Sequence, residues 1–414
     1  MAVTAVPTPA RKPSTPSTPG FTLTPTATYA RNIESGAPLV FLAGERVLTL
    51  SEPLGQVCDI LAHRTKPVRP ATLAKKLSWS QPRATQALQA LRAAGVVQQG
   101  TSAPAAPIQA PRVEFRRPCM LKVTVFDPEP VCRSLASVAN RLRSRLGVVL
   151  AIVGAVAQVL ACLWASHTHG LTLIPGGGWT VVAMALGLLA LINLVHELAH
   201  GAVLMSAGGR PRRLGVMLFY LAPAFFCDVS DSFRLGRRAQ TEVALAGVAV
   251  QCQLGLVLAP LALTMHDAFG VAVQHAMALN LLAVLINLLP FVALDGYFVL
   301  RVRVGLPNLR EAAMAAWKKA LHRRPSSPRP CGRAAQRLPR WAIPYGVAAS
   351  IAPVVLVVWS LYVCAARCWS GEPAGWVPLG IGVLVGLHYL WGQRHAAGAY
   401  LRLHFRREDP SRAA

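Results

Sequence analysis

The stretch "LINLVHELAHG", residues 191–201, places two histidines and a glutamate inside a run that is otherwise apolar. Ionisable or metal-binding side chains are costly at membrane depth, so they indicate a functional site by default. His196 and His200 are four residues apart, which puts both rings on one face of a helix. With Glu197 beside them, His-Glu-x-x-His supplies two nitrogen ligands for zinc and a general base. The alternative is a helix whose histidines hydrogen-bond to neighbouring spans.

The surrounding composition predicts a multi-pass membrane protein. Of the 414 residues, 53% are hydrophobic and 14% are charged, whereas soluble proteins carry about 25% charged residues. Long uncharged runs account for the difference, so we expect an all-α membrane protein with about six transmembrane helices. The expected spans are residues 146–166, 179–207, 241–265, 271–300, 341–366 and 376–391.

The distribution of charge predicts the orientation of these spans. Residues 208–240, 301–340 and 394–414 contain 22 Arg and Lys, whereas the opposite loops contain only Arg367. The positive-inside rule therefore predicts a cell-membrane protein with both termini in the cytoplasm. The formal charge of +25 is then mostly a topology signal and argues against nucleic-acid binding.

Composition shifts also divide the chain into segments. Residues 1–36 are rich in Pro, Thr and Ser without the apolar core of a signal peptide, and we expect a disordered tail. The other expected segments are a winged-helix-like or peptide-recognition domain (37–100), a linker with a basic juxtamembrane segment (101–145), an intramembrane core (146–300), a basic cytosolic connector (301–340), two further spans (341–393) and a cytosolic tail (394–414). The juxtamembrane arginines and the connector are expected to contact anionic lipid.

The segment 37–100 has the pattern of a small α+β domain. Two short apolar runs around Gly44 and Glu45 predict a hairpin. Ser51 and Pro53 begin a helix, two further helices follow, and "VVQQ" predicts a closing strand. The order is winged-helix-like.

The same segment, with "LAGERVLTLSE" and "ALQALRAAGVV", resembles both a DNA-binding winged helix and the leader-peptide recognition domain similar to PqqD. The second resemblance implies a domain that holds a peptide as an added strand. The third helix carries only Arg83 and Arg92, a thin basic face for a DNA reader. This favours a peptide reader over DNA, with a purely structural regulatory domain as a third interpretation.

A third metal ligand is expected because catalytic zinc usually has three protein ligands. The fourth span contains "NLLPFVALDGYFVL", residues 287–300, in which Pro290 and Gly296 predict non-helical backbone around Asp295. The second and fourth spans run in the same direction, so the histidines and Asp295 arrive in the cytoplasmic half together. The alternative places Asp295 at a helix end in the interface.

His196-Glu197-Leu198-Ala199-His200, followed by Asn287, Pro290 and Asp295-Gly296, resembles the site-2 protease family of intramembrane zinc metalloproteases. The resemblance implies that Zn²⁺ is held by His196, His200 and Asp295 and that Glu197 is the catalytic base. It also implies a substrate-positioning or oxyanion role for the segment with Asn287, Pro290 and Gly296.

The stretch "FYLAPAFFCDVSDSFRLGRR", residues 219–238, is similar to peptide zinc metalloproteases found with ribosomally made peptide pathways, including the daptide-type branch. This similarity implies a substrate-gating loop containing Tyr220, Pro223, Asp228 and Asp231. Metal ligation by Asp228 or Asp231 is the alternative.

Three functions compete on this evidence. The first is a zinc endopeptidase that removes the leader of a ribosomally made peptide, bound by the N-terminal domain. The second is a regulatory protease that releases a membrane-tethered factor. The third is a non-catalytic metal-binding membrane protein, which is disfavoured because a scaffold has no need of Glu197 beside two ligands. In either protease, bound zinc would make a water more acidic, and Glu197 would take its proton and return it to the leaving amine.

Overall fold

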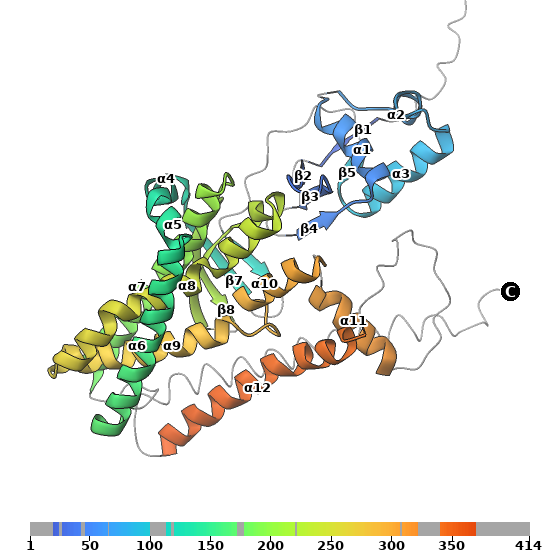
Figure 1. The fold of residues 1–414 in the computed structure, drawn as a ribbon. Coiled ribbons are helices and arrows are strands. Elements are labelled where there is room, and N and C mark those ends of the chain that lie inside the picture. The colour runs from blue at the N-terminus through green and yellow to red at the C-terminus, as the bar shows by residue number, and fades with distance from the viewer. Residues whose placement is uncertain are drawn as a thin grey trace, which may run out of the picture. The chain divides into compact units, whose positions relative to one another are not determined.

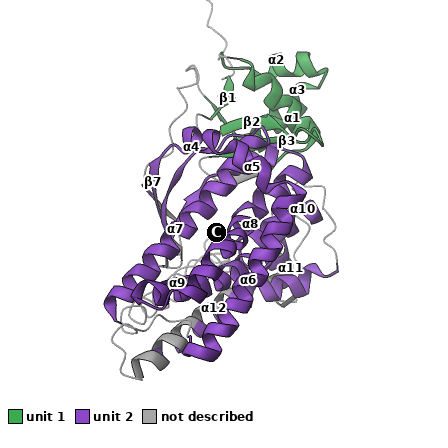
Figure 2. Cartoon of the chain, turned by 60° about the vertical axis from the view of Figure 1, so that its left-hand side comes forward, with its two compact units in different colours: residues 1–110 green, residues 111–414 purple. Residues whose placement is uncertain are grey.

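The chain forms two compact units, residues 1–110 and 111–414 (Figure 2). The computed structural model describes residues 20–24, 27–42, 46–64, 66–99, 113–116, 120–171, 178–219, 222–306, 309–321 and 340–369.

Unit 1 is a small α+β domain with two antiparallel sheets. One sheet pairs β1 with β5, and the other has the order β2-β3-β4. Its elements are β1 (Phe21–Leu23), β2 (Ala27–Arg31), β3 (Pro38–Leu42), β4 (Arg46–Thr49), α1 (Glu52–Ala62), α2 (Pro70–Leu77), α3 (Gln81–Ala93) and β5 (Val97–Gln99). The predicted hairpin, three helices and closing strand are confirmed.

The beginning of unit 1 differs from prediction. The tail expected over residues 1–36 contains β1 and β2, and residues 1–19 lie outside the described residues. Phe21 is 6% exposed and joins the core formed by the apolar faces of α1, α2 and α3. The Pro/Thr-rich composition of this segment does not predict strands. β1 and β2 are short, so their conformation depends on pairing with β5 and β3, which the local sequence does not show.

Four helices of unit 2 are long and apolar enough to cross a membrane: α6 (Arg145–His169), α7 (Trp179–Ser206), α8 (Arg237–Thr264) and α9 (Ala268–Asn287). They pack against one another as a bundle (Figure 1). The fifth predicted span coincides with α12 (Ala342–Trp369). The sixth, residues 376–391, lies outside the described residues.

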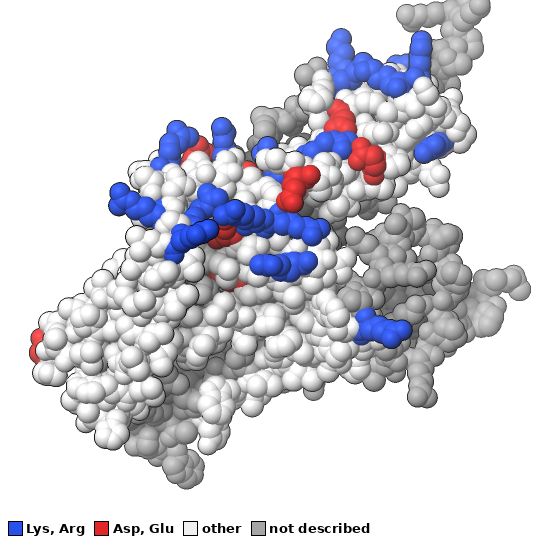
Figure 3. Space-filling view, viewed as in Figure 1, with Lys and Arg blue, Asp and Glu red and all other residues white. Residues whose placement is uncertain are grey.

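The surface of unit 2 separates charge from apolar area. Lys and Arg gather over the end of the unit that carries α4 (Glu129–Ser134) and α5 (Ala136–Leu142), while the flank of the long helices is almost uncharged (Figure 3). α6 exposes a row of large apolar side chains, including Val149, Ile152 and Leu160. An apolar flank with a basic rim is the surface expected of a bundle that faces lipid.

Unit 2 also contains a four-stranded antiparallel sheet, so it is mostly helical but not all-α as predicted. The strands are β6 (Val113–Arg116), β7 (Met120–Phe126), β8 (Leu214–Phe219) and β9 (Ala222–Cys227), in that order. β7 and β8 come from segments about ninety residues apart, paired from Met120 with Phe219 to Phe126 with Leu214. Among the described residues, β6 and β9 form the two edges of this sheet.

The segment expected as linker and juxtamembrane anchor, 101–145, is therefore largely part of the fold. After β6 and β7, α5 packs Ala139 against Ala202 and Val203 of α7. Arg143, expected to contact lipid, donates to Glu242 of α8 at 2.7 Å. Exposed Arg141 and Arg145 remain available for the predicted lipid contact.

The fourth predicted span is interrupted, as Pro290 and Gly296 suggested. α9 ends at Asn287, residues 288–294 are non-helical, and α10 (Asp295–Val304) begins at the aspartate. α10 and α11 (Leu309–Leu321) pack with α12 through Tyr297, Leu309 and Tyr345. The Tyr345 hydroxyl donates to the Pro290 carbonyl at 2.8 Å, so α12 supports the interruption.

Candidate metal centre

Three predicted ligands converge inside unit 2. The Nε2 atoms of His196 and His200, on consecutive turns of α7, lie 3.0 Å apart. Asp295 places Oδ2 3.4 Å from His196 Nε2 and Oδ1 3.4 Å from His200 Nε2. All three residues are buried, and their ligand atoms lie within 4.8 Å of one another. The group could bind a metal ion.

Helix α8 holds the other nitrogen of each imidazole. His200 Nδ1 lies 2.6 Å from the Val243 carbonyl oxygen, and His196 Nδ1 lies 2.9 Å from Gln251 Oε1. A carbonyl oxygen only accepts, so His200 Nδ1 carries a hydrogen and donates it. Gly247 lies between these two partners on the same face of α8, and a Cβ there would collide with the His196 ring. The face of α8 is thus shaped to the two histidines.

This arrangement fits a divalent cation. With both Nδ1 atoms donating, each neutral imidazole presents its Nε2 lone pair to the other, which is repulsive without a positive charge between them. The Asp295 carboxylate adds negative charge at the same point, and its buried Oδ2 has no hydrogen-bond partner among the described residues. Two imidazoles and one carboxylate are a donor set of catalytic zinc sites.

Asp295 reaches the histidines because the chain breaks before it. Asp295 is the first residue of α10, where an acidic side chain is favoured by the helix dipole. Gly296 packs closely on the end of α9, since a Cβ there would collide with the Leu288 carbonyl oxygen. The break and the glycine together let α10 start beside α7.

Glu197 lies at the junction between α7 and the sheet. Its Oε2 accepts a hydrogen bond of 2.8 Å from the backbone N–H of Cys227. Cys227 is the last residue of edge strand β9. Glu197 follows His196 directly in sequence, and the residue is half-buried. It is therefore held between the candidate metal ligands and a strand edge.

Lys122 is a buried lysine beside β9 that the sequence did not predict as part of the site. It belongs to β7, is 8% exposed, and places its Nζ 4.8 Å from the centre of the Phe226 ring. A signal existed, because "LKVTV" alternates polar and apolar residues as a half-buried strand does.

The other predicted substrate residues have different outcomes. Asn287 is half-buried at the end of α9, and the Pro290 carbonyl is engaged by Tyr345. Pro223 pairs with Leu218 in the β8–β9 hairpin. Tyr220 lies outside the described residues. Their roles toward substrate stay predictions.

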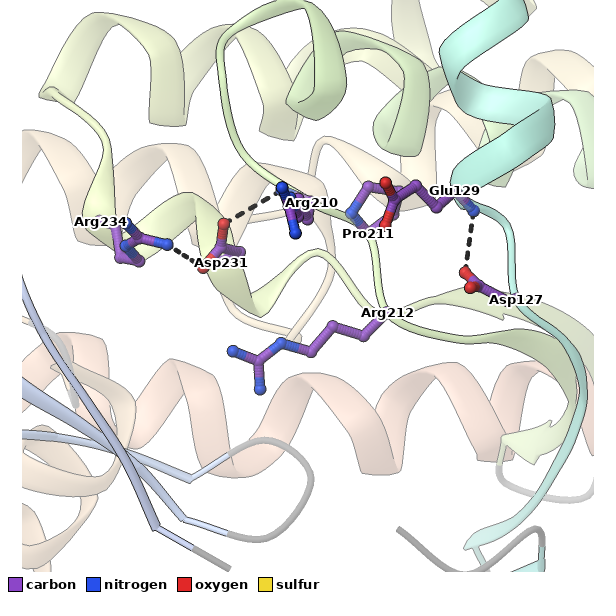
Figure 4. Close-up of a pocket in the computed structure, with 7 residues that line it drawn as sticks. All are labelled: Asp127, Glu129, Arg210, Pro211, Arg212, Asp231 and Arg234. Atoms are coloured by element: carbon purple, nitrogen blue, oxygen red, sulfur yellow. Dashed lines mark hydrogen bonds and ion pairs between the residues drawn. The ribbon is translucent and has the colours of Figure 1, made fainter. Parts of the chain in front are cut away.

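Asp228 and Asp231 brace the loop after β9 and are not members of the metal group found among the described residues. Asp231 accepts from the Arg210 backbone N–H at 3.0 Å and pairs with Arg234, beside a pocket that Asp127, Glu129 and Arg212 also line (Figure 4). Asp228 pairs with Arg213 at 3.4 Å. Both carboxylates are buried and already bind arginine side chains or backbone N–H groups.

Comparisons of the chain with protein-family models, curated proteins and solved structures gave no match. The candidate site therefore stands on its own geometry.

Proposed function

We propose that this protein is an intramembrane zinc endopeptidase that hydrolyses a peptide bond near the cytoplasmic membrane face. The observation that carries the proposal is the facing pair of histidine Nε2 atoms, completed by Asp295 and adjoined by Glu197. His196, His200 and Asp295 would hold the zinc. A carboxyl group beside such a donor set serves hydrolysis and is superfluous for metal storage.

The chemistry divides between the metal and the chain. Bound zinc supplies Lewis acidity, which polarises a carbonyl and makes a water more acidic. Glu197 accepts a proton at its carboxylate and later gives it to the leaving amine. The Cys227 N–H holds that carboxylate beside β9. Buried Lys122, whose Nζ lies 4.8 Å from the centre of the Phe226 ring, adds positive charge beside β9.

Substrate delivery is proposed to use the sheet. A scissile carbonyl must be presented in extended chain, because a helical carbonyl is already hydrogen-bonded. β9 is an edge strand that ends at the Glu197 contact, so an extended peptide added there would pass the carboxylate.

A maturation role is favoured by unit 1. The two arginines of α3 are both engaged: Arg83 stacks on the Trp79 ring at 4.5 Å, and Arg92 donates to Gln99 at 2.7 Å. This supports a peptide reader over a DNA reader, and we propose that unit 1 binds the leader of the substrate peptide. Release of a membrane-tethered factor is the alternative.

The test uses zinc-loaded protein in liposomes with a mixed peptide library in water enriched in ¹⁸O. We expect the wild type to produce new peptides with ¹⁸O in their C-terminal carboxylates, detected by mass spectrometry. Glu197→Gln should retain zinc and produce none of them. Identical product spectra for the two proteins would refute the peptidase. The precursor peptide identified this way is then titrated against residues 1–110, with duplex DNA as the competing ligand.

A further inference from the structure

We infer that Gln251 is a positioning residue for His196, and that Gln158 and Asn280 fix α8 and Gln251 in place from the bundle interior. A buried amide network would then be part of the metal centre. The inference rests on the proposed metal site, but it concerns residues that no ligand motif contains.

The network links four helices through side chains with no exposed surface. Gln158 of α6, Gln251 of α8 and Asn280 of α9 are each 0% exposed. Asn280 Nδ2 donates to Gln158 Oε1 at 2.7 Å and to the Gln251 carbonyl at 3.1 Å. Gln251 Oε1 lies 2.9 Å from Nδ1 of His196 on α7. One connected path therefore runs from α6 to the metal ligand.

The orientation of each interior amide follows from its partners. Gln158 Nε2 faces the backbone carbonyls of Gln251 and Cys252, at 3.1 and 3.3 Å, so it must be the donor end. Gln158 Oε1 then faces Asn280, whose NH₂ group must point to it. The two amides therefore clamp the backbone of α8 at residue 251 in one rotational position.

Close helix packing makes this clamp possible. A Cβ on Gly154 of α6 would collide with the Cys252 carbonyl, and a Cβ on Gly255 of α8 would collide with Gly154. The glycines let the backbones of α6 and α8 come into contact. Gln158 can therefore reach carbonyl oxygens of α8 that would be too far away if the helices were further apart.

The network is poor as a device for stability alone. Gln251 Nε2 and Asn280 Oδ1 are buried without a hydrogen-bond partner among the described residues, and such groups are unfavourable. Apolar side chains of the same size would fill the space without that cost. The network instead fixes the tautomer of His196. Because Gln251 Oε1 accepts a hydrogen bond, His196 Nδ1 must carry the hydrogen, and the lone pair of its Nε2 then faces the metal position.

The experiment measures metal affinity, which needs no substrate. Full-length protein in detergent is stripped with a chelator, and zinc binding is followed by competition with a chromophoric chelator. Cobalt is titrated in parallel, because its absorption bands report ligand geometry. Loss of an outer partner typically weakens metal binding about 10- to 100-fold, and we expect that range for Gln251→Leu. Gln158→Leu should weaken binding less, and Gln251→Glu, which keeps the acceptor, should restore it.

The chain offers a matched control in Gln274. This side chain is 3% exposed on α9 and donates to the Ala262 carbonyl at 3.0 Å, but has no hydrogen bond with the network or the histidines. Gln274→Leu removes the same kind of buried bond and should leave zinc affinity and cobalt bands unchanged.

Each outcome decides the inference. Weakened binding in Gln251→Leu and Gln158→Leu, with the control unchanged, supports it. Wild-type affinity in Gln251→Leu overturns it, as does equal weakening in Gln274→Leu, which would reveal a general packing effect. If Gln251→Leu does not fold, failure of folded Gln251→Glu to bind zinc overturns it. A wild type that binds zinc but cleaves nothing refutes only the peptidase, whereas one that binds no zinc refutes both.

Discussion

The space occupied by the His196 ring exists because residue 247 has no side chain. Val243 and Gln251 hold the two imidazoles one turn above and below this glycine. The geometry of the metal centre thus depends on the missing Cβ at residue 247 as well as on the ligands. This dependence can be tested without touching any ligand.

We predict that Gly247→Ala abolishes stoichiometric zinc binding. The added Cβ would collide with Cε1, Nε2 and Nδ1 of the His196 ring, so the ring would have to leave its position beside Asp295. The measurement is zinc per chain after dialysis of purified protein.

Gly187→Ala is the control, because a Cβ at Gly187 of the same helix as His196 meets nothing within 4 Å. It should bind zinc as the wild type does. Normal zinc content in Gly247→Ala would show that the ring does not occupy this space.

Two cysteines should be inert in the folded protein. Burial raises the pKa of Cys58 to about 12 and that of Cys132 to about 11. At pH 8 a thiol with a pKa of 11 is about one-thousandth thiolate, and the thiolate is the reactive form. We predict slow alkylation by iodoacetamide at both positions, mapped by mass spectrometry, and fast alkylation after denaturation. Rapid labelling of folded protein would contradict their burial.

Among single residues, the sequence predicted those candidate ligands whose spacing matches a known metal-binding pattern. His196, Glu197 and His200 follow from a motif, and Asp295 from a polar residue beside a helix breaker. Val243 could not be found, because it contributes a backbone carbonyl that any residue has. Gln251 is visible as an amide in an apolar run, but only tertiary packing shows that it meets His196.

Among the elements, the interruption between α9 and α10 has a support that the sequence did not indicate. Tyr345 of α12 donates to the Pro290 carbonyl, and its ring lies 5.9 Å from that of Phe291. α12 thereby braces the segment that carries Asp295 to the histidines.

We predict that Tyr345→Phe lowers stability by about 1 kcal/mol, the usual net value of one hydrogen bond, and weakens zinc binding several-fold. Thermal unfolding with and without zinc would separate the two effects. Ser350→Ala, which removes only a bond to the Gly346 carbonyl within α12, should retain zinc affinity. Equal affinity in both variants would exclude a supporting role for the Tyr345 hydroxyl.

The sheet of unit 2 marks the limit of prediction at the element scale. Hydropathy identifies the four long helices because each is long and apolar. β7 pairs with β8 across an intervening pair of spans, and no local pattern specifies such a partner. The arginines of 112–145 resemble a lipid anchor in the sequence, and only tertiary packing shows that one of them, Arg143, pairs with Glu242 of α8.

For the whole molecule, the charged end of unit 2 predicts one orientation. An epitope inserted after Gly170, at the far end of α6, should be accessible to antibody in intact spheroplasts. An epitope at the N-terminus should require permeabilisation. The reverse result would invert the topology and place the metal centre in the opposite half of the membrane.

Unit 1 should lose stability in acid. Hydrogen bonds from Arg31, the closest at 2.6 Å, lower the pKa of Asp59. A lowered folded pKa gives stability that is present above the unfolded value of about 3.9 and is lost as pH falls through the folded value. Both side chains are about one-third exposed, 34 and 36%, so solvent screening limits the effect to about 1 kcal/mol.

Urea unfolding of residues 1–110 between pH 2 and 6 would measure this. Asp59→Asn should be less stable than the wild type at pH 6, and the difference should shrink as the pH falls. A constant difference would show that the carboxylate does not contribute through its charge.

The interruption before α10 also has a consequence for the order of biogenesis. The two histidines are synthesised about a hundred residues before Asp295, which at 5–20 residues per second is roughly 5–20 s. During that interval α7 can already be inserted while its ligand set is incomplete. Metal loading would therefore follow insertion of the whole core, and a ribosome-bound chain truncated at residue 290 should capture no zinc.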